Sequence, residues 1–404
     1  MTDNLEEIFS FINENIDKDP LKLRLASNKT TNRDQIDFAI TQIECRNKNK
    51  TKLSDFLANN RFVFPDSVSA QQSSHQGVAT YHASLIKKGD IILDMTSGLG
   101  IDAFSMARKA SRITAIDCDQ NKVDALRHNC KILNISNLQA ICTDSIELLR
   151  KTDETFDVIF IDPSRRDSAN KRLFGLQDCS PDVIGNHELI LQHGRRILIK
   201  ASPMIDVSQT IRDLSNITAI RAVGIKGECK EILIEMKGVV DSVTDDRAPI
   251  RLQAVNLDND GGIISDFHTI INNKNQIDYI SETDSWEDCF LLEPSSMIMK
   301  ISPWSEICQR FNAKKLDGPS HLFLTKDYNP DFPGRVSKFE RIIKKQDRKT
   351  LAGLPLSVIS RNYPVSTDEL RKSLKLKEGD ANFLYATRVC GKPVMLLTSF
   401  CQNR

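Results

Sequence analysis

The stretch IILDMTSGLGIDA, residues 91–103, decides how this chain of 404 residues folds. Its apolar beginning, Ile91–Met95, predicts a buried strand, and the segment after Gly100 predicts a helix. Between them lies a tight turn with two glycines, where a side chain would keep a ligand away from the backbone and the helix N-terminus. The stretch therefore predicts a strand, a ligand-binding glycine loop and a helix in succession.

Residues 76–240 continue this alternation of short apolar runs and amphipathic segments. The runs that predict strands are Ile91–Met95, Ile113–Asp117, Leu138–Cys142, Val158–Asp162, Ile197–Ala201, Ala219–Gly224 and Ile232–Met236. The segments that predict helices lie near Ala103–Lys109, Asn121–Leu133, Ser145–Lys151 and Asp182–Gln192. Such alternation indicates an α/β fold with a parallel sheet covered on both faces. Only seven residues join the last two runs, too few for a parallel crossover, so we expect seven strands ending in an antiparallel hairpin.

The flanking segments have a different character. Residues 1–75 predict helices, one of them over Gln35–Arg46, and we expect no chemistry there. A connecting β-hairpin is predicted within residues 241–283, around the turn DNDGG. Residues 284–334 predict a strand, a helix over Pro294–Phe311 and a strand, and residues 335–404 predict a strand, a helix and two strands. We therefore expect two small α+β modules after the sheet.

Composition limits the class of protein. Fifty-five basic and 54 acidic residues leave a net charge of +1, which argues against a general polyanion-binding coat but allows a local basic patch. No apolar run reaches the roughly 18–20 residues that cross a bilayer, and the acidic start MTDNLEEIF does not resemble a signal peptide. The ten cysteines are dispersed without a C-x-x-C pair. We therefore expect a cytoplasmic protein with free thiols, no metal and no membrane partner.

Two classes of ligand fit the glycine loop. Gly98, Gly100 and Ala103 satisfy G-x-G-x-x-A, and Asp117 follows Gly98 by 19 residues, as in dinucleotide-binding folds. However, Asp94 ends the first strand and points its carboxylate at the same crevice, where it would repel a pyrophosphate and attract a sulfonium. S-adenosylmethionine, which has a positive charge, a ribose and an adenine but no phosphate, fits this loop better than a nicotinamide cofactor.

Acidic residues close four successive predicted strands: Asp94, Asp117, Asp144 and Asp162. Each one alone reads most simply as a helix cap or turn residue. Together they lie at the carboxyl edge of the sheet, where ligands bind in this fold. We expect Asp117 to bind the ribose and Asp144 to accept a hydrogen bond from the adenine amino group.

At these residues the sequence resembles the class I S-adenosylmethionine-dependent methyltransferases, and most closely the bacterial methyltransferases with a C-terminal THUMP-like domain. The motifs that carry the resemblance are DMTSGLGIDAF (94–104), IDPSRRD (161–167), LIKASPMID (198–206) and GECKEI (227–232). Further matches are SAQQSSHQGVATYHASLI (69–86), FLLEPSSMIMK (290–300) and HLFLTKDYNPDFPGRV (321–336).

The resemblance implies both an architecture and a cofactor site. The architecture is an N-terminal helical region (1–75), a seven-stranded Rossmann-like methyltransferase domain (76–240), a connecting hairpin (241–283), a ferredoxin-like module (284–334) and a THUMP-like domain (335–404). The residues implied to hold S-adenosylmethionine are Asp94, Thr96, Gly98, Gly100, Asp117, Cys118, Asp144 and Ser145.

The acceptor side of the site is predicted at Asp162, Pro163, Arg165 and Arg166. Methyltransferases that act on exocyclic amino groups usually carry Asp/Asn-Pro-Pro-aromatic here, and this chain lacks the second proline and the ring. The two arginines would clamp a phosphate or stack on a base instead. Carbon-methylating enzymes often place a cysteine where this chain has Ser164. Lys200 is either a functional residue at the active edge of the sheet or a solvated or ion-paired lysine, and we interpret His75 and His82 as cap or helix-surface residues.

Residues 335–349, RVSKFERIIKKQDRK, form a local basic run with seven basic and two acidic residues. Such a run is either a solvated face or a surface that follows phosphates. THUMP modules bind RNA, typically tRNA, so the resemblance implies a methyltransferase acting on a base in structured RNA (tRNA or rRNA). Two alternatives stay open: a small-molecule methyltransferase, favoured if the run is buried or ion-paired, and a non-catalytic RNA-binding protein with a degenerate pocket. The sequence does not specify an oligomeric state.

Overall fold

A computed structural model of the chain describes residues 5–26, 33–165, 176–240, 249–271 and 276–401. The chain divides into two compact units. The first contains Met1–Ile250 and Val255–Ser265, and the second contains Arg251–Ala254 and Asp266–Arg404. Within the described ranges, no helix combines the length and the apolar character that a membrane span requires.

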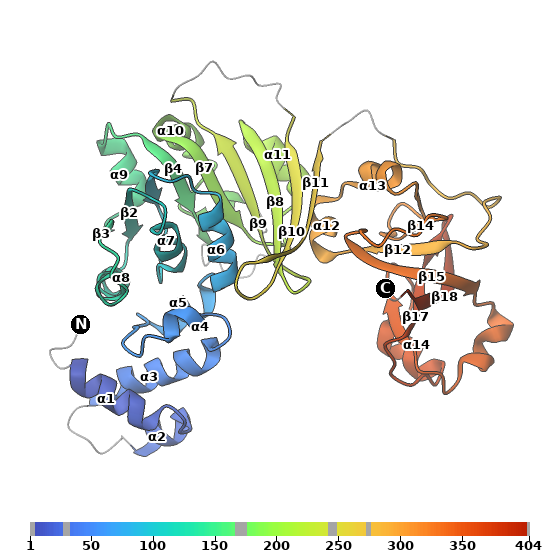
Figure 1. The fold of residues 1–404 in the computed structure, drawn as a ribbon, viewed down its shortest axis with the longest axis horizontal. Helices are drawn as coiled ribbons and strands as arrows, with labels where there is room; N and C mark the ends of the chain where they lie inside the picture. The colour runs from blue at the N-terminus through green and yellow to red at the C-terminus, as the bar shows by residue number, and fades with distance from the viewer. Residues whose placement is uncertain (1–4, 27–32, 166–175, 241–248, 272–275, 402–404) are drawn as a thin grey trace. The chain divides into compact units, whose positions relative to one another are not determined.

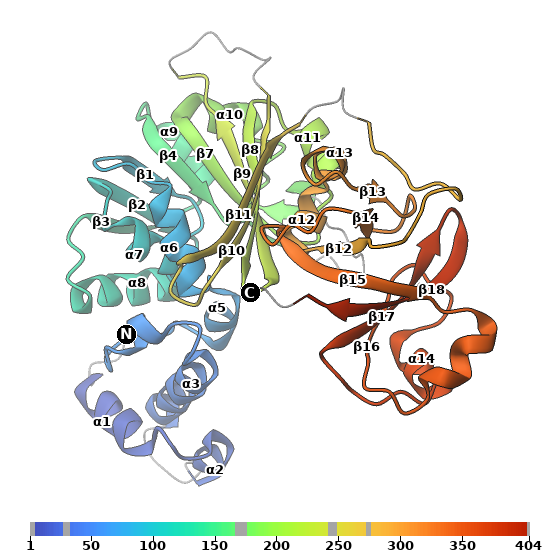
Figure 2. The same ribbon diagram turned by 45° about the vertical axis from the view of Figure 1, so that its right-hand side comes forward.

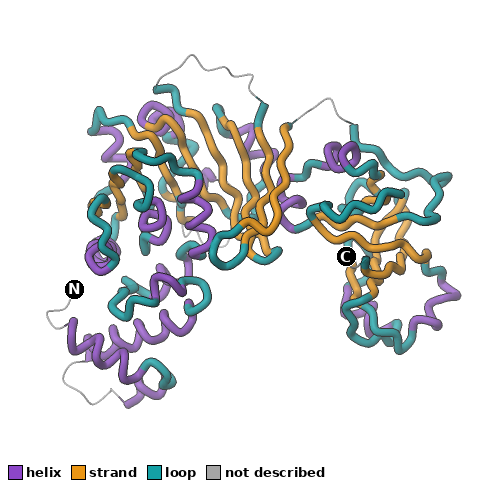
Figure 3. Tube along the Cα trace, viewed as in Figure 1, coloured by secondary structure: helices purple, strands orange, loops and turns teal. Residues whose placement is uncertain are grey.

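Among the described residues before the first strand, the regular elements are all helices, as predicted (Figure 3). They are α1 (Leu5–Asn15), α2 (Pro20–Ala26), α3 (Arg33–Asn49), α4 (Ser54–Leu57), α5 (Ser67–Gln72) and α6 (Gln76–Ser84). Ile8, Phe9 and Ile12 recur at helical spacing and pack against Ala39 and Ile43 of α3. The predicted helix Gln35–Arg46 lies within α3.

The central sheet contains all seven predicted strands. The order is β11-β10-β8-β9-β7-β4-β1-β2-β3, and β1, β2, β3, β4 and β7 run parallel while β9 pairs antiparallel with β7 and β8. The hairpin predicted as a connector, β10 and β11, continues this sheet to nine strands (Figure 1). The bounds are β1 (Ile91–Asp94), β2 (Arg112–Asp117), β3 (Leu138–Cys142), β4 (Phe156–Ile161), β7 (Gly194–Ala201), β8 (Ile217–Ile225), β9 (Glu228–Lys237), β10 (Arg251–Leu257) and β11 (Ile263–Ile270).

Helices cover both faces of this sheet, as parallel strands require (Figure 2). One face carries α6, α7 (Ile101–Met106) and α8 (Gln120–Ile132), with α6 packed against α7, and the other carries α9 (Ser145–Lys151), α10 (His187–His193) and α11 (Val207–Asp213). Two short strands, β5 (Ser164–Arg165) and β6 (Cys179–Ser180), pair with each other after β4, and a 3-10 turn, η2 (Leu176–Asp178), precedes β6. The helix observed in the segment predicted over Asp182–Gln192 is shorter than predicted, because α10 begins only at His187.

The second unit contains one seven-stranded sheet with the order β13-β14-β12-β15-β18-β17-β16. Its strands are β12 (Phe290–Pro294), β13 (Lys314–Lys315), β14 (Phe323–Thr325), β15 (Gly334–Ile342), β16 (Ser357–Ser360), β17 (Asn382–Val389) and β18 (Lys392–Phe400). Its helical elements are α12 (Ser296–Ile301), α13 (Trp304–Arg310), the 3-10 segment η3 (Lys345–Leu351) and α14 (Thr367–Ser373). Because β15 pairs with both β12 and β18, the two predicted C-terminal modules share one sheet.

The single helix predicted over Pro294–Phe311 is wrong. Two helices, α12 and α13, occupy the segment, and Ser302 between them adopts a left-handed conformation with φ 49°. Pro303 follows, and a proline disfavours a helical conformation in the residue before it. The apolar periodicity continues across this break, which is why the pattern predicted one helix.

Candidate functional site

The predicted cofactor residues meet at the carboxyl ends of β1 to β4. They line one cavity of about 660 Å³, together with Asp102 and Asp162. The predicted residues in this lining are Asp94, Thr96, Gly98, Gly100, Asp117, Cys118, Asp144 and Ser145. This cavity is called the loop cavity below, and its ability to bind a cofactor stays a prediction.

The two glycines of the loop serve different purposes. Both have positive φ, 52° at Gly98 and 88° at Gly100, a region that residues with a Cβ rarely adopt. A Cβ at Gly100 would overlap the side chain of Leu126, so this glycine lets α7 and α8 pack closely. A Cβ at Gly98 would meet no atom within 4 Å. Gly98 therefore leaves open space beside the loop backbone.

Asp117 and Asp144 also hold the loops in place. Asp117 accepts hydrogen bonds from the Gly98 N–H at 3.2 Å and from the Asp119 N–H at 2.9 Å. Asp144 is the N-cap of α9 and accepts from the N–H groups of Ile146 and Glu147. The helix-cap interpretation therefore holds for Asp144, although its side chain still belongs to the cavity lining.

Asp94 is a buried carboxyl, with 1% of the residue exposed. Its Oδ1 accepts a hydrogen bond from the Thr96 N–H at 3.1 Å. Burial, together with the charges of Asp102 and Asp162, raises the pKa of Asp94 to about 8 despite that hydrogen bond. At neutral pH the Asp94 carboxyl is therefore mostly protonated. From the sequence we assumed an ionised Asp94 that attracts a sulfonium, and this attraction requires that the bound cation lower the pKa of Asp94.

Asp162 stands at the end of β4, where its N–H donates to Thr96 Oγ1 at 2.7 Å. Its Oδ2 accepts from Lys200 Nζ at 2.5 Å, and Lys200 also lies 2.9 Å from Ser74 Oγ. Burial raises the pKa of Asp162, an effect that the Lys200 ammonium opposes. Lys200 is thus ion-paired, one of the two interpretations given from the sequence.

The predicted arginine clamp is described only in part. Arg165 lies in β5 opposite Cys179 of β6, and Arg166 falls outside the described residues. Pro163 lines a second cavity of about 580 Å³, called the acceptor cavity below. It shares Gln72, Ser73, Ser74 and Asp162 with the loop cavity, so the two cavities meet at Asp162.

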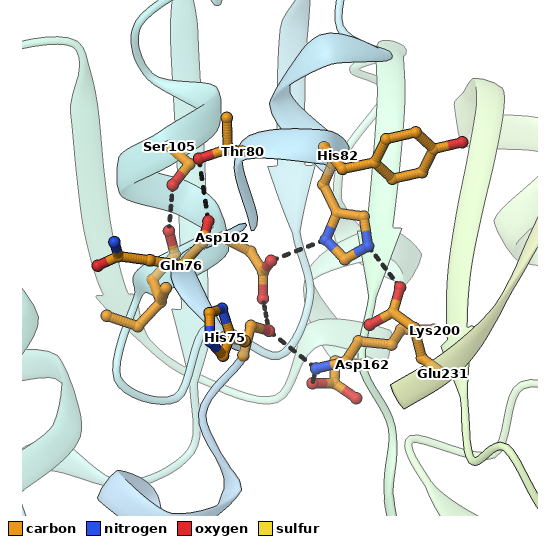
Figure 4. A network of polar contacts seen from close by, with 12 residues as sticks. His75, Gln76, Thr80, His82, Asp102, Ser105, Asp162, Lys200 and Glu231 are labelled. Carbon is orange, nitrogen blue, oxygen red and sulfur yellow. Dashed lines mark hydrogen bonds and ion pairs between the residues drawn. The ribbon is translucent and has the colours of Figure 1, made fainter. Parts of the chain in front are cut away.

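A chain of buried polar groups runs beside this junction (Figure 4). His82 of α6, with no exposed surface, contacts Asp102 Oδ1 through Nδ1 at 2.8 Å and Glu231 Oε1 through Nε2 at 2.6 Å. The Ser74 hydroxyl donates to Asp102 and also contacts Lys200. The chain therefore connects Glu231 of β9 with Asp162.

The surface or cap interpretation of His82 is wrong. Burial alone lowers the pKa of His82, but the charge of Glu231 and the hydrogen bonds with both carboxylates outweigh it and raise the pKa to about 10. The imidazole is therefore a buried cation between two carboxylates. The absence of charged residues other than histidine from α6, QGVATYHAS, is the sequence signal that fits this burial, whereas His75 is the helix cap that we predicted.

Within the described ranges, no group of three or more histidine, cysteine or acidic side chains is arranged to hold a metal ion.

Family models match three parts of the chain. A THUMP domain-like model matches residues 335–399, a ferredoxin-like domain model residues 290–333, and the model of conserved hypothetical protein 95 residues 79–182. A protein of Porphyromonas gingivalis W83 assigned as a methyltransferase matches with a TM-score of 0.82 and 27% identity, over 99% of this chain and 98% of that one. These likenesses confirm the predicted resemblance and fold class.

Two curated relatives match part of the chain. A 23S rRNA (uracil(1939)-C(5))-methyltransferase of Legionella pneumophila is 25% identical over 134 residues, 30% of each chain. The ribosomal RNA small subunit methyltransferase D of Buchnera aphidicola is 34% identical over 93 residues, 22% of this chain and 48% of the relative. The chain thus spans less than half the length of these curated relatives.

Proposed function

We propose that this protein is a cytoplasmic S-adenosylmethionine-dependent methyltransferase that modifies a base nitrogen in structured RNA, either tRNA or rRNA. The observation that carries the proposal is the junction of two cavities at Asp162, one beside the glycine loop and one beside Pro163. A methyl donor in the first cavity and an acceptor in the second would meet at this carboxylate.

The residues of the loop cavity fit S-adenosylmethionine. The open space at Gly98 admits a ligand to the backbone, Asp117 has the place of a ribose-binding carboxylate, and Asp144 that of an adenine acceptor. Asp94 would face the cationic end of the ligand. When bound, the cofactor supplies a methyl group on a sulfonium, which needs no further activation.

Asp162 is the group that fits an amino or ring nitrogen acceptor. Lys200 occupies its Oδ2, and no described residue donates a hydrogen bond to Oδ1. Oδ1 would accept a hydrogen bond from the target N–H, orient the nitrogen and take up the proton released after transfer. Carbon methylation through a cysteine is disfavoured because Ser164 follows Pro163.

The basic run supports RNA as the acceptor. Arg335 pairs with Glu293 at 2.7 Å, but six further basic side chains of the run are exposed. Within the described part of the chain, none of the six charged side-chain groups forms an ion pair within 4.0 Å. They are Lys338, Arg341, Lys344, Lys345, Arg348 and Lys349. Apart from Arg335, the basic side chains of the run are therefore neither buried nor ion-paired, which disfavours the small-molecule alternative.

Two assays test this proposal. Calorimetry with S-adenosylmethionine should detect binding to the wild type and to Asp153→Ala, an exposed control, but not to Asp117→Ala. Transfer of a tritiated methyl group should label total RNA rather than a small-metabolite pool, and Asp162→Ala should abolish it. Absence of cofactor binding by the wild type would leave only the non-catalytic alternative.

A further inference from the structure

The acceptor cavity is lined by three lysines and one histidine, and methyl transfer alone does not require this group of basic side chains. Its lining includes Lys52, His75, Lys200 and Lys230 beside Asp162 and Pro163. We propose that this cavity holds a phosphate group of the acceptor nucleotide, bound chiefly by Lys52 and Lys230. The inference deepens the proposed function and rests on it for the identity of the acceptor.

Lys52 is a partly buried ammonium without a carboxylate partner. Its Nζ donates to the backbone carbonyls of Ala70 at 3.3 Å and Gln71 at 2.8 Å. Among the described residues, no acidic side chain lies within 4.0 Å of it. An ammonium has three N–H donors, so the third is free to bind a ligand oxygen in the cavity.

The other charges of the lining leave this cation uncompensated. Lys200 is paired with Asp162, and Glu231 shares the buried imidazolium of His82 with Asp102, so these five groups together carry one net negative charge, fewer than the two positive charges of Lys52 and Lys230. Lys230 pairs with Glu228 at 2.6 Å, but the Glu228 side chain is 75% exposed, and such surface pairs contribute little. Lys52 and Lys230 therefore give the cavity an excess of positive charge.

The titration of Lys52 agrees with this charge excess. Burial, followed by the charges of Lys200 and Lys230, lowers the pKa of Lys52 to about 8. A bound anion would counteract the lowered pKa by supplying negative charge at short range.

His75 adds a neutral donor to the same lining (Figure 4). Its Nδ1 accepts a hydrogen bond from the Gly77 N–H at 3.1 Å, so in the neutral ring the proton resides on Nε2. Burial and the charges of Lys230 and Lys52 lower the pKa of His75 and maintain that neutral form. The Nε2–H is then available to a ligand, because no described residue accepts it.

Phosphate is the anion that fits these donors. It offers several oxygens to separate N–H groups, and lysine binds it as a point charge. A nucleotide joins a base to a phosphate, so a base nitrogen at Asp162 would bring a phosphate into the same cavity. Lys52 lies in the turn between α3 and α4. If it binds phosphate, residues 1–75 contribute a ligand-binding residue, contrary to what we expected from the sequence.

The test measures the reactivity of Lys52 itself, so that RNA bound to the basic run does not interfere. The acetylation rates of Lys52 and of the exposed Lys88 would be measured by mass spectrometry at pH 8 in the full-length protein. Adenosine, adenosine 5′-monophosphate and a ten-nucleotide RNA of random sequence are the added probes. We expect the monophosphate or the RNA to slow acetylation of Lys52 while adenosine does not, and Lys88 to be unaffected.

A variant identifies the binding groups. Lys230→Met should raise the monophosphate or RNA concentration that protects Lys52 by about tenfold, since charge-assisted hydrogen bonds are lost. Lys88→Met should leave that concentration unchanged. Protection by RNA alone identifies a phosphodiester, and protection by the monophosphate identifies a free nucleotide. Equal acetylation of Lys52 with all three probes would overturn the inference.

Binding of S-adenosylhomocysteine, measured separately by calorimetry, reports on the loop cavity. Its absence would refute the proposed function without altering the Lys52 result.

Discussion

Replacing His82 by leucine removes the only cation of a buried three-residue cluster while preserving the volume of the side chain. Asp102 and Glu231 are 9% and 2% exposed and would lose the cation that lies between them. Breaking a buried ion pair in this way costs about 3–5 kcal/mol of unfolding free energy. In a unit of this size that cost corresponds to a loss of roughly 6–20 °C in Tm.

Urea titration and differential scanning calorimetry at pH 7 measure this loss. The matched control is His268→Leu, because His268 contacts Asp266 at 2.8 Å but has 66% of its side chain exposed. Its removal should change the unfolding free energy by less than about 0.5 kcal/mol. A loss below 1 kcal/mol in His82→Leu would refute the conclusion that a buried imidazolium joins α6 to β9.

The pH dependence of stability checks the same cluster. The pKa of His82 is raised from 6.5 to about 10, so the folded state retains a proton that the unfolded state releases. Its contribution is complete below pH 6.5 and is lost as the pH rises through about 10. In Glu231→Gln, which removes the charge that raises this pKa most, the loss should finish at lower pH. An identical profile in both proteins would contradict this assignment.

Three further outcomes follow from the site and the basic run. Gly100→Ala should lower the free energy of unfolding in urea titration, because the new Cβ overlaps Leu126. The Cβ of Gly98→Ala meets open space, so this variant should chiefly weaken S-adenosylmethionine binding in calorimetry. S-adenosylhomocysteine lacks the sulfonium charge of S-adenosylmethionine. The affinity for S-adenosylmethionine relative to S-adenosylhomocysteine should increase as the pH rises through about 8, where Asp94 ionises, and Asp94→Asn should abolish that increase. Changing Lys344, Lys345, Arg348 and Lys349 together to glutamine should weaken RNA binding equally across sequences and reduce its salt dependence, measured by filter binding between two salt concentrations.

Local patterns account for the parts of the fold that the sequence predicted. The strands of the central sheet are short apolar runs. Asp94 and Asp117 are the last residues of their strands, and Asp162 and Asp144 follow theirs by one and two residues. The predictions failed where packing overrides periodicity. Ser302 and Pro303 divide one apolar pattern into two helices, and the hairpin of β10 and β11 joins the central sheet because its neighbour β8 offers an unpaired edge.

By itself, the sequence determined the glycine loop and the acidic residues at the strand ends, because each depends on only a few consecutive residues. Tertiary structure alone decided which distant groups become partners. His82 and Glu231 are 149 residues apart, and Lys200 and Ser74 are 126 apart. Such contacts depend on how α6 and the strands pack. The burial that results decides the charge of each group, because a buried ionisable side chain takes the protonation state that its neighbours stabilise.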